Sequence, residues 1–233
     1  MRTMKPTRLH LVLPALLAAA ALFHTAGCQC LVPTGSKGSA KASSQSTSTN
    51  AWRTIFDGKS LAGWQETDFA GRGAVQVVGG ELRLGAGAIL TGVTYTNTLP
   101  RVNYEVEYEA MKLEGVDFFA ALTFPVGKAH ATFVNGGWGG SVTGVSSVDG
   151  MDASENDTTK TIGYEKGRWY KFRLRVTAEK IEAWVDAEKL VDQPIKDRAI
   201  SMRAGEIELS APLGFANFQT SSALRNIRLR ALN

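Results

Sequence analysis

Alternating apolar and polar residues dominate the chain from residue 51 onward. Residues 104–110 read Tyr-Glu-Val-Glu-Tyr-Glu-Ala, and residues 170–176 read Tyr-Lys-Phe-Arg-Leu-Arg-Val. A period of two puts successive side chains on opposite faces of a strand, so each segment is predicted to be a strand with one buried face. Residues 181–185 follow closely and predict a hairpin with the second segment, and residues 224–232 are predicted to form the last strand.

Shorter apolar segments, separated by Gly, Pro, Asn and Asp, predict more strands. They lie at residues 75–78, 81–84, 118–124, 131–134, 141–146, 206–210 and 214–219. The sequence has no amphipathic helical pattern longer than about two turns. Many short strands without intervening helices predict an all-β fold, an antiparallel β-sandwich, over residues 51–233.

The outward positions of two predicted strands carry opposite charges. Glutamates occupy every second position from 105 to 109, and basic residues occupy every second position from 171 to 175. The two rows fit cross-strand neighbours on one sheet face, because like charges alone would repel. Two separately solvated faces fit equally well, since an exposed ion pair contributes well under ~1 kcal/mol.

The first 50 residues have the composition of an export signal and a tether. Three basic residues precede an apolar run at 11–23, and Ala26-Gly27-Cys28 follows it. This order predicts a signal peptide over residues 1–27. Its ending resembles a bacterial lipobox, which implies cleavage before Cys28, lipid attachment to that cysteine, and an exported protein held at the bacterial outer membrane or in the periplasm. The alternative is an ordinary secretory peptide cut near Gly27.

Residues 28–50 are rich in Ser, Thr, Gly, Ala and Lys and predict a flexible tether, with a reach of roughly 25 Å. Removing residues 1–27 takes away three basic residues and no acidic ones, so the formal charge falls from +4 to +1. Nucleic-acid binding therefore loses its main support. Both cysteines, Cys28 and Cys30, lie in the tether, so the predicted domain holds together without disulfides. Nothing in the sequence indicates an oligomeric state.

A glycine-rich segment at residues 135–140 holds one aromatic residue, Trp138. A ring exposed among glycines is suited to stacking against the apolar face of a sugar. The alternative is that Trp138 folds back as a core plug. Trp184 is a second candidate for sugar binding, because it is out of phase with the core-facing residues of its predicted strand. The alternative is that Trp184 lies under a covering loop.

Residues 149–157 concentrate four carboxylates and one amide. Asp149, Asp152 and Glu155 are candidate ligands for Ca²⁺, the only cofactor that the sequence suggests, and Asn156 is a candidate for bonding sugar hydroxyls. The alternative is a solvated acidic loop. Since His130 is the only histidine after the predicted signal, and no Gly-x-Ser-x-Gly motif is present, a multi-histidine zinc site and a nucleophile elbow are excluded.

Four motifs carry a resemblance to a known family. They are Phe-Asp-Gly-Lys-Ser-Leu-Ala-Gly-Trp at 56–64, Trp169-Tyr170, Trp184-x-Asp186 and the closing strand from Leu224. Together they resemble the 3-keto-disaccharide hydrolase domain family, formerly a domain of unknown function. The resemblance implies a concanavalin A-like jelly roll, a carbohydrate partner and hydrolysis of 3-keto glycosides. At residues 115–118 and 131–134 the chain departs from the family pattern, so no family carboxylate is carried over there.

Candidate catalytic groups therefore come from chemistry. A ketone at C3 of a sugar acidifies the C2–H bond, and a carboxylate can abstract that proton. Asp149, Glu155 and Asp117 are the candidates for base and acid. Arg168 is a candidate partner of Asp117 or of the substrate, or it only flanks the strand beginning at Trp169.

Two other functions fit the same sequence: a non-catalytic glycan-binding domain that uses Trp138 and Trp184 on one face, and a structural protein of the cell envelope.

Overall fold

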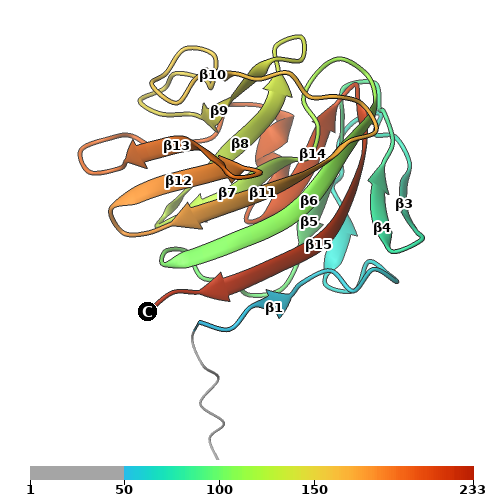
Figure 1. Cartoon of the computed structure of the whole chain (residues 1–233), viewed down its shortest axis with the longest axis horizontal. Coiled ribbons are helices and arrows are strands. Elements are labelled where there is room, and N and C mark those ends of the chain that lie inside the picture. Colours follow the sequence, from blue (N-terminus) through green and yellow to red (C-terminus); the bar gives the residue numbers. More distant parts are fainter. Residues whose placement is uncertain (1–49) are drawn as a thin grey trace, which may run out of the picture. The chain divides into compact units, whose positions relative to one another are not determined.

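The computed structural model describes residues 50–233, which form two antiparallel β-sheets packed face to face (Figure 1). The predicted signal peptide, Cys28, and the tether up to residue 49 lie outside the described residues. The prediction of an all-β sandwich is confirmed. Within residues 50–233 there is no helix long and apolar enough to cross a membrane.

Sheet A contains eight strands. Their spatial order is β13 (Glu188–Pro194), β12 (Lys180–Val185), β11 (Trp169–Val176), β6 (Tyr104–Glu114), β15 (Ser221–Ala231), β4 (Glu81–Leu84) and β3 (Val75–Val78), with β1 (Arg53–Thr54) pairing with β15. The charged rows of β6 and β11 are cross-strand neighbours, since Glu105 lies opposite Arg175 and Glu109 opposite Lys171. The alternative of two separately solvated faces is therefore wrong.

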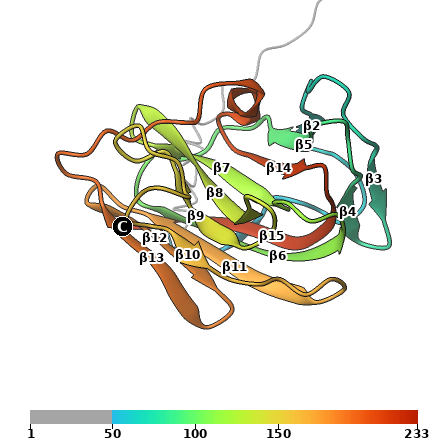
Figure 2. The same ribbon diagram turned by 90° about the horizontal axis from the view of Figure 1, so that it is seen from above.

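Sheet B contains seven strands. Their order is β10 (Lys160–Thr161), β9 (Val142–Ser146), β8 (Ala129–Gly137), β7 (Ala121–Val126), β14 (Gly214–Phe218), β5 (Leu90–Tyr95) and β2 (Trp64–Glu66). Residues 206–210, predicted as a strand, instead form the short 3-10 helix η1 (Glu206–Ser210). In Figure 2 this red coiled ribbon lies beyond sheet B, on the side away from sheet A.

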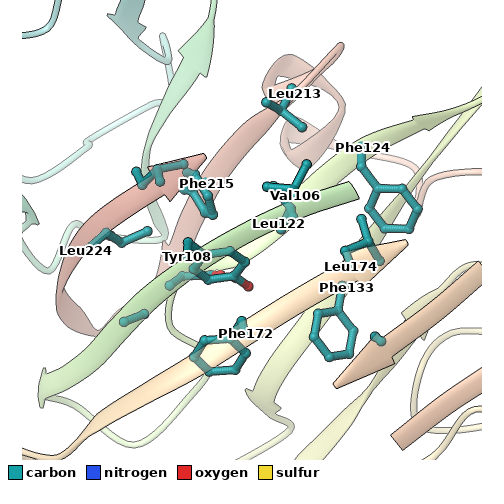
Figure 3. Packing of buried hydrophobic residues seen from close by; sticks show 14 of the residues in the cluster. Val106, Tyr108, Leu122, Phe124, Phe133, Phe172, Leu174, Leu213, Phe215 and Leu224 are labelled. Carbon is teal, nitrogen blue, oxygen red and sulfur yellow. The ribbon is translucent and has the colours of Figure 1, made fainter. Parts of the chain in front are cut away.

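The core fills the space between the two sheets (Figure 3). Tyr108 and Phe172 of sheet A stack with ring centroids 4.9 Å apart, and Phe215 of sheet B meets Tyr108 edge-on at 4.8 Å. The opening motif closes one end of this core, because Trp64 is buried and its indole Nε1 donates to the carbonyl oxygen of Ile55 at 2.7 Å. Because the inward faces of both sheets are buried in the core, functional groups have to lie on the outer faces or on the connecting loops.

Candidate functional site

A pocket of about 500 Å³ lies on the outer face of sheet B. Strand β8 shows why the pocket is on this face: Phe133 is completely buried in the core, and its neighbours Thr132 and Val134 point the other way and line the pocket. The segment leading into η1 forms another wall. The polar lining consists of Asp117, Thr132, Ser146, Arg203 and Glu206, and the apolar lining includes Ile89, Leu90, Phe118, Val134, Trp138, Ile207 and Phe218.

Trp138 lies at the tip of the β8–β9 hairpin and lines the pocket. Its side chain is 41% exposed, so it is no core plug. Its backbone has φ = 48°, a left-handed conformation that is costly for a residue with a side chain. The glycines around it allow the tight turn, since a Cβ on Gly140 would lie 2.5 Å from the carbonyl oxygen of Val116. The hairpin thus presents an aromatic ring to the pocket at the expense of local backbone strain.

Asp117 is held in the pocket wall by backbone donors. Its Oδ1 accepts from the N–H of Phe118 at 2.7 Å, and its Oδ2 accepts from the N–H of Gly139 at 3.0 Å. The second bond joins the loop carrying Asp117 to the hairpin carrying Trp138. Lys112 is buried nearby, and burial lowers the pKa of its amine while the charge of Asp117 acts in the opposite direction. The carboxylate is thereby fixed beside the exposed ring.

Arg203 completes the polar part of the pocket. Its guanidinium carbon lies 6.0 Å from the centroid of the Trp138 ring, and its Nη1 donates to Asp152 at 2.7 Å. The other oxygen of Asp152 accepts from the hydroxyls of Ser146 and Ser147 at 3.4 and 3.2 Å. Asp152 therefore orients the arginine that lines the pocket.

None of the four carboxylates of the acidic segment lines the pocket, and Asp152 acts on it only through Arg203. Asp149 forms an ion pair with Arg198, with 2.5 Å between Oδ2 and Nε, and it accepts from the N–H of Ala199 at 2.7 Å. Glu155 is exposed. Within residues 50–233, no three His, Cys, Asp or Glu side chains come together in a way that could hold a metal ion. The structure thus does not gather Asp149, Asp152 and Glu155 into the cation site that their spacing suggested.

Asn156, a candidate for sugar binding, is buried and uses its amide inside the protein. Its Nδ2 donates to the carbonyl oxygens of Val145, Met151 and Asp152 at 2.8 to 3.0 Å. Its Oδ1 accepts from the N–H and hydroxyl of Thr158. This side chain braces the loop that follows β9 and leaves no group for a ligand.

Trp184 and Arg168 also lie outside the pocket. Trp184 points away from the core on the outer face of sheet A, where the guanidinium of Arg173 lies 3.9 Å from the centroid of its ring. Trp138 and Trp184 thus belong to different sheets, and the prediction that they share one face is wrong. Arg168 pairs with Asp186 at 3.0 Å, beside the strand that begins at Trp169. Its ion-pair partners are Asp186 and Glu165 rather than Asp117.

Comparison with known proteins places these features in a family. The model of the 3-keto-alpha-glucoside-1,2-lyase-like domain matches residues 51–230. The chain belongs to this family. No curated protein matches the sequence. The family match covers nearly all the described residues, and with them the whole pocket.

Two solved structures show the same fold as this lyase-like domain. One comes from work on endo-acting O-glycanases that members of the human gut microbiota express to initiate mucin breakdown. It is 13% identical, the match covers 78% of this chain and 99% of that chain, and the TM-score is 0.55. The other is the β-glucanase of Bacillus licheniformis, with 11% identity, coverage of 80% and 100%, and a TM-score of 0.52. The concanavalin A-like jelly-roll architecture, seen in glycoside hydrolases, is confirmed.

Sequence reasoning missed two charged residues of the pocket of this lyase-like domain, Arg203 and Glu206. Both lie at the entry to η1, which was predicted as a strand. The available signal was weak: Arg203 and Glu206 lie on either side of Ala204-Gly205, just before the apolar residue Ile207. Only the folded chain brings them into the same pocket as Asp117, about 90 positions earlier in the sequence.

Proposed function

We propose that this protein cleaves the glycosidic bond of 3-keto glycosides by elimination, in the pocket on the outer face of sheet B. The observation that carries the proposal is the shared pocket of Asp117, Trp138, Arg203 and Glu206. The family description, a 1,2-lyase-like domain for 3-keto-alpha-glucosides, supports this choice of reaction. In this proposal Asp117 is the only one of the three candidate catalytic carboxylates that keeps a catalytic role.

Asp117 acts as the base. The C3 ketone lowers the pKa of the C2–H bond, and the carboxylate takes that proton. The electron pair left on C2 is delocalised into the ketone as an enolate. It then forms a C1–C2 double bond while the bond between C1 and the leaving oxygen breaks. The leaving oxygen takes a proton from the Glu206 carboxyl group or from water, and later addition of water to the double bond makes the net reaction a hydrolysis.

Arg203 stabilises the enolate oxygen. A guanidinium already fixed in place favours the charge that develops in the transition state, because little reorganisation is needed when the charge appears. The ion pair with Asp152 supplies that fixed position. Trp138 stacks against the apolar face of the sugar ring, so the reacting C2 lies beside Asp117, which is bonded to the neighbouring Gly139.

The test is the release of free sugar from a 3-keto disaccharide by the purified protein and its variants. We expect Asp117→Asn to lower kcat at least about 100-fold, since it removes the base. Glu155→Gln is the matched control, because it neutralises an exposed carboxylate outside the pocket. Elimination also predicts exchange of the C2 proton with solvent deuterium. Full activity in Asp117→Asn would refute the assignment of the base.

A non-catalytic glycan-binding domain is the second candidate function. The observation in its favour is the largely apolar lining around the exposed ring of Trp138. It predicts saturable binding of a glycan without release of sugar or deuterium exchange in any condition, with or without Ca²⁺. In either case we propose an exported protein with carbohydrate as its partner and a lipid anchor at Cys28 that holds it to the bacterial outer membrane or in the periplasm.

A further inference from the structure

The floor of the pocket is a small apolar cluster separate from the main core. Phe69, Leu90 and Ala216 are its buried members. Phe118, Ile207 and Phe218 pack on them, are only partly buried, and line the pocket with their remaining surface. The sandwich does not need this cluster to close its core, because the core between the sheets is complete without it.

Two aromatic rings, those of Phe118 and Phe218, form part of this floor. The rings of Phe118 and Phe218 lie with centroids 5.7 Å apart, tilted by 42°. Their backbones are joined, since the N–H of Phe218 donates to the carbonyl oxygen of Phe118 at 3.1 Å. The two rings are therefore fixed relative to each other and form a preformed apolar surface.

The apolar character extends to the rim. Ile89 and Trp138, 47% and 41% exposed, line the pocket. Val116 and Leu209 are also strongly exposed, and they lie one and two positions from the lining residues Asp117 and Ile207. Of the seven large apolar side chains that residues 50–233 expose, two line this pocket and two more lie within two sequence positions of a lining residue. A gathering of this kind marks a ligand-binding surface more often than chance exposure does.

An apolar group suits this surface better than a second sugar does. Every sugar ring carries several hydroxyls, and hydroxyls brought against Phe118, Ile207 and Phe218 would lose water without gaining a partner. Asp117 lies at the boundary between the two parts of the pocket: Gly139, next to Trp138, bonds its carboxylate on one side, and Phe118 follows it on the other. A sugar on Trp138 with its C2 at Asp117 would direct its C1 substituent toward the two phenylalanines.

We infer that the preferred substrates are glycosides whose group at C1 is apolar and about the size of an aromatic ring. This inference rests on the proposed function for the sugar half of the substrate. The occupant is a small apolar group because the floor adjoins the carboxylate and the exposed indole inside a pocket of about 500 Å³, a size typical of small-molecule sites.

The experiment compares the binding of phenyl α-D-glucoside and methyl α-D-glucoside to the purified protein by calorimetry. Both lack the 3-ketone, so neither is consumed, and they differ only in the group at C1. We expect the phenyl compound to bind about tenfold more tightly or better, as burial of the added ring predicts. Ile89→Ser, which makes the apolar rim polar, should reduce the difference. Val78→Ser is the matched control, since Val78 is also 47% exposed but lies on β3 of sheet A.

Equal affinities for the two compounds, or equal effects of Ile89→Ser and Val78→Ser, would overturn the inference. So would a dimer of the wild-type protein in solution that dissociates in Ile89→Ser, because the surface would then be a contact between two copies. The proposed function fails separately, if no 3-keto glycoside is cleaved. A phenyl preference without cleavage would support the apolar binding surface and refute the proposed enzymatic function. Cleavage without a phenyl preference would support the enzymatic function and refute the apolar binding surface.

Discussion

At the residue scale, the site depends on side chains held in demanding local conformations. Trp138 has a positive φ in a tight hairpin, and Asp117 uses both carboxylate oxygens to bind backbone N–H groups. Backbone strain that the surrounding structure maintains is often found where a side chain has a function. Trp138 nevertheless stays 41% exposed, which is the pattern expected of a ligand-binding residue.

Replacing Trp138 separates binding from stability. Trp138→Gly suits the positive φ and removes an exposed ring, so we expect the free energy of unfolding to change by less than about 1 kcal/mol. Trp138→Ala keeps the strain and should be less stable than Trp138→Gly by about 1 kcal/mol. Both should weaken sugar binding. Urea denaturation and calorimetry measure the two effects, and a loss of about 3–5 kcal/mol in Trp138→Gly would instead identify a core residue.

Replacing Asn156, in contrast to replacing Trp138, should lower the free energy of unfolding strongly. Its buried amide makes five hydrogen bonds within the loop after β9, so Asn156→Ala is expected to lower the free energy of unfolding by about 2–4 kcal/mol. The exposed neighbour Glu155 supplies the control, and Glu155→Ala should stay within about 0.5 kcal/mol of wild type. If both variants lost a similar amount of unfolding free energy, the cause would be a general sensitivity of the loop and not the hydrogen bonds of the Asn156 amide.

The candidate site was only partly predictable from the sequence for a physical reason. Asp117 and Trp138 were recognisable because each breaks a local pattern: an acid beside an apolar strand and a ring among glycines. Asp149 and Asn156 have equally suggestive neighbours, but the former pairs with Arg198 and the latter bonds backbone carbonyls. Such partners come from distant segments or from loop geometry, which alternation along one strand does not encode.

At the element scale, most strands were predictable from the sequence, including β7 and β14, whose residues are almost all buried, but β5 and β13 were not. The alternation of β6 and β11 gave their position and their core-facing residues. Their opposite charges fitted cross-strand pairing and two separately solvated faces equally well, and only the strand register of the structure decides for pairing. Strand β5 (Leu90–Tyr95) is as completely buried as β7, but its sequence, Leu-Thr-Gly-Val-Thr-Tyr, has neither alternation nor a continuous apolar run that would mark it. A strand without a solvent-exposed face shows no alternation.

The charged outer face of sheet A should make stability depend on pH. Burial raises the pKa of the Glu182 carboxyl, but hydrogen bonds and charge from Lys189 and Lys180 outweigh it, so the pKa is lowered overall. The same lysines lower the pKa of Asp192. A carboxyl whose pKa is lower in the folded state stabilises the protein above the unfolded-state pKa, and this stabilisation is lost as the pH falls through the folded-state value.

We therefore expect Tm to fall between about pH 5 and pH 3, and Glu182→Gln to be less stable than wild type at pH 7 but nearly equal to it at pH 3. Thermal unfolding followed by circular dichroism across this range tests the expectation. Glu114→Gln is the control, because Glu114 forms an exposed pair with Lys166 and should change Tm little at any pH. A constant difference between wild type and Glu182→Gln would contradict the role of the carboxylate.

At the scale of the whole molecule, the two outer faces of the sandwich have different properties. The outer face of sheet A is covered by ion pairs, and the outer face of sheet B carries the pocket. Strand β1, the first of the described strands, pairs with β15 in sheet A. The first described strand therefore belongs to one sheet, and the pocket lies on the outer face of the other. This arrangement suits a domain that is attached through its N-terminal segment.

Attachment at Cys28 is the prediction that this arrangement makes worth testing. In a bacterium that expresses the full chain, we expect the wild type to incorporate labelled palmitate and to fractionate with membranes, because the ending of the predicted signal resembles a lipobox. Cys28→Ser should lose both properties. Cys30→Ser is the matched control and should keep both, since it leaves the predicted cleavage site intact. If Cys28→Ser behaved like wild type, an ordinary secretory signal cut near Gly27 would be the better description, and the domain would reach its substrate without an anchor.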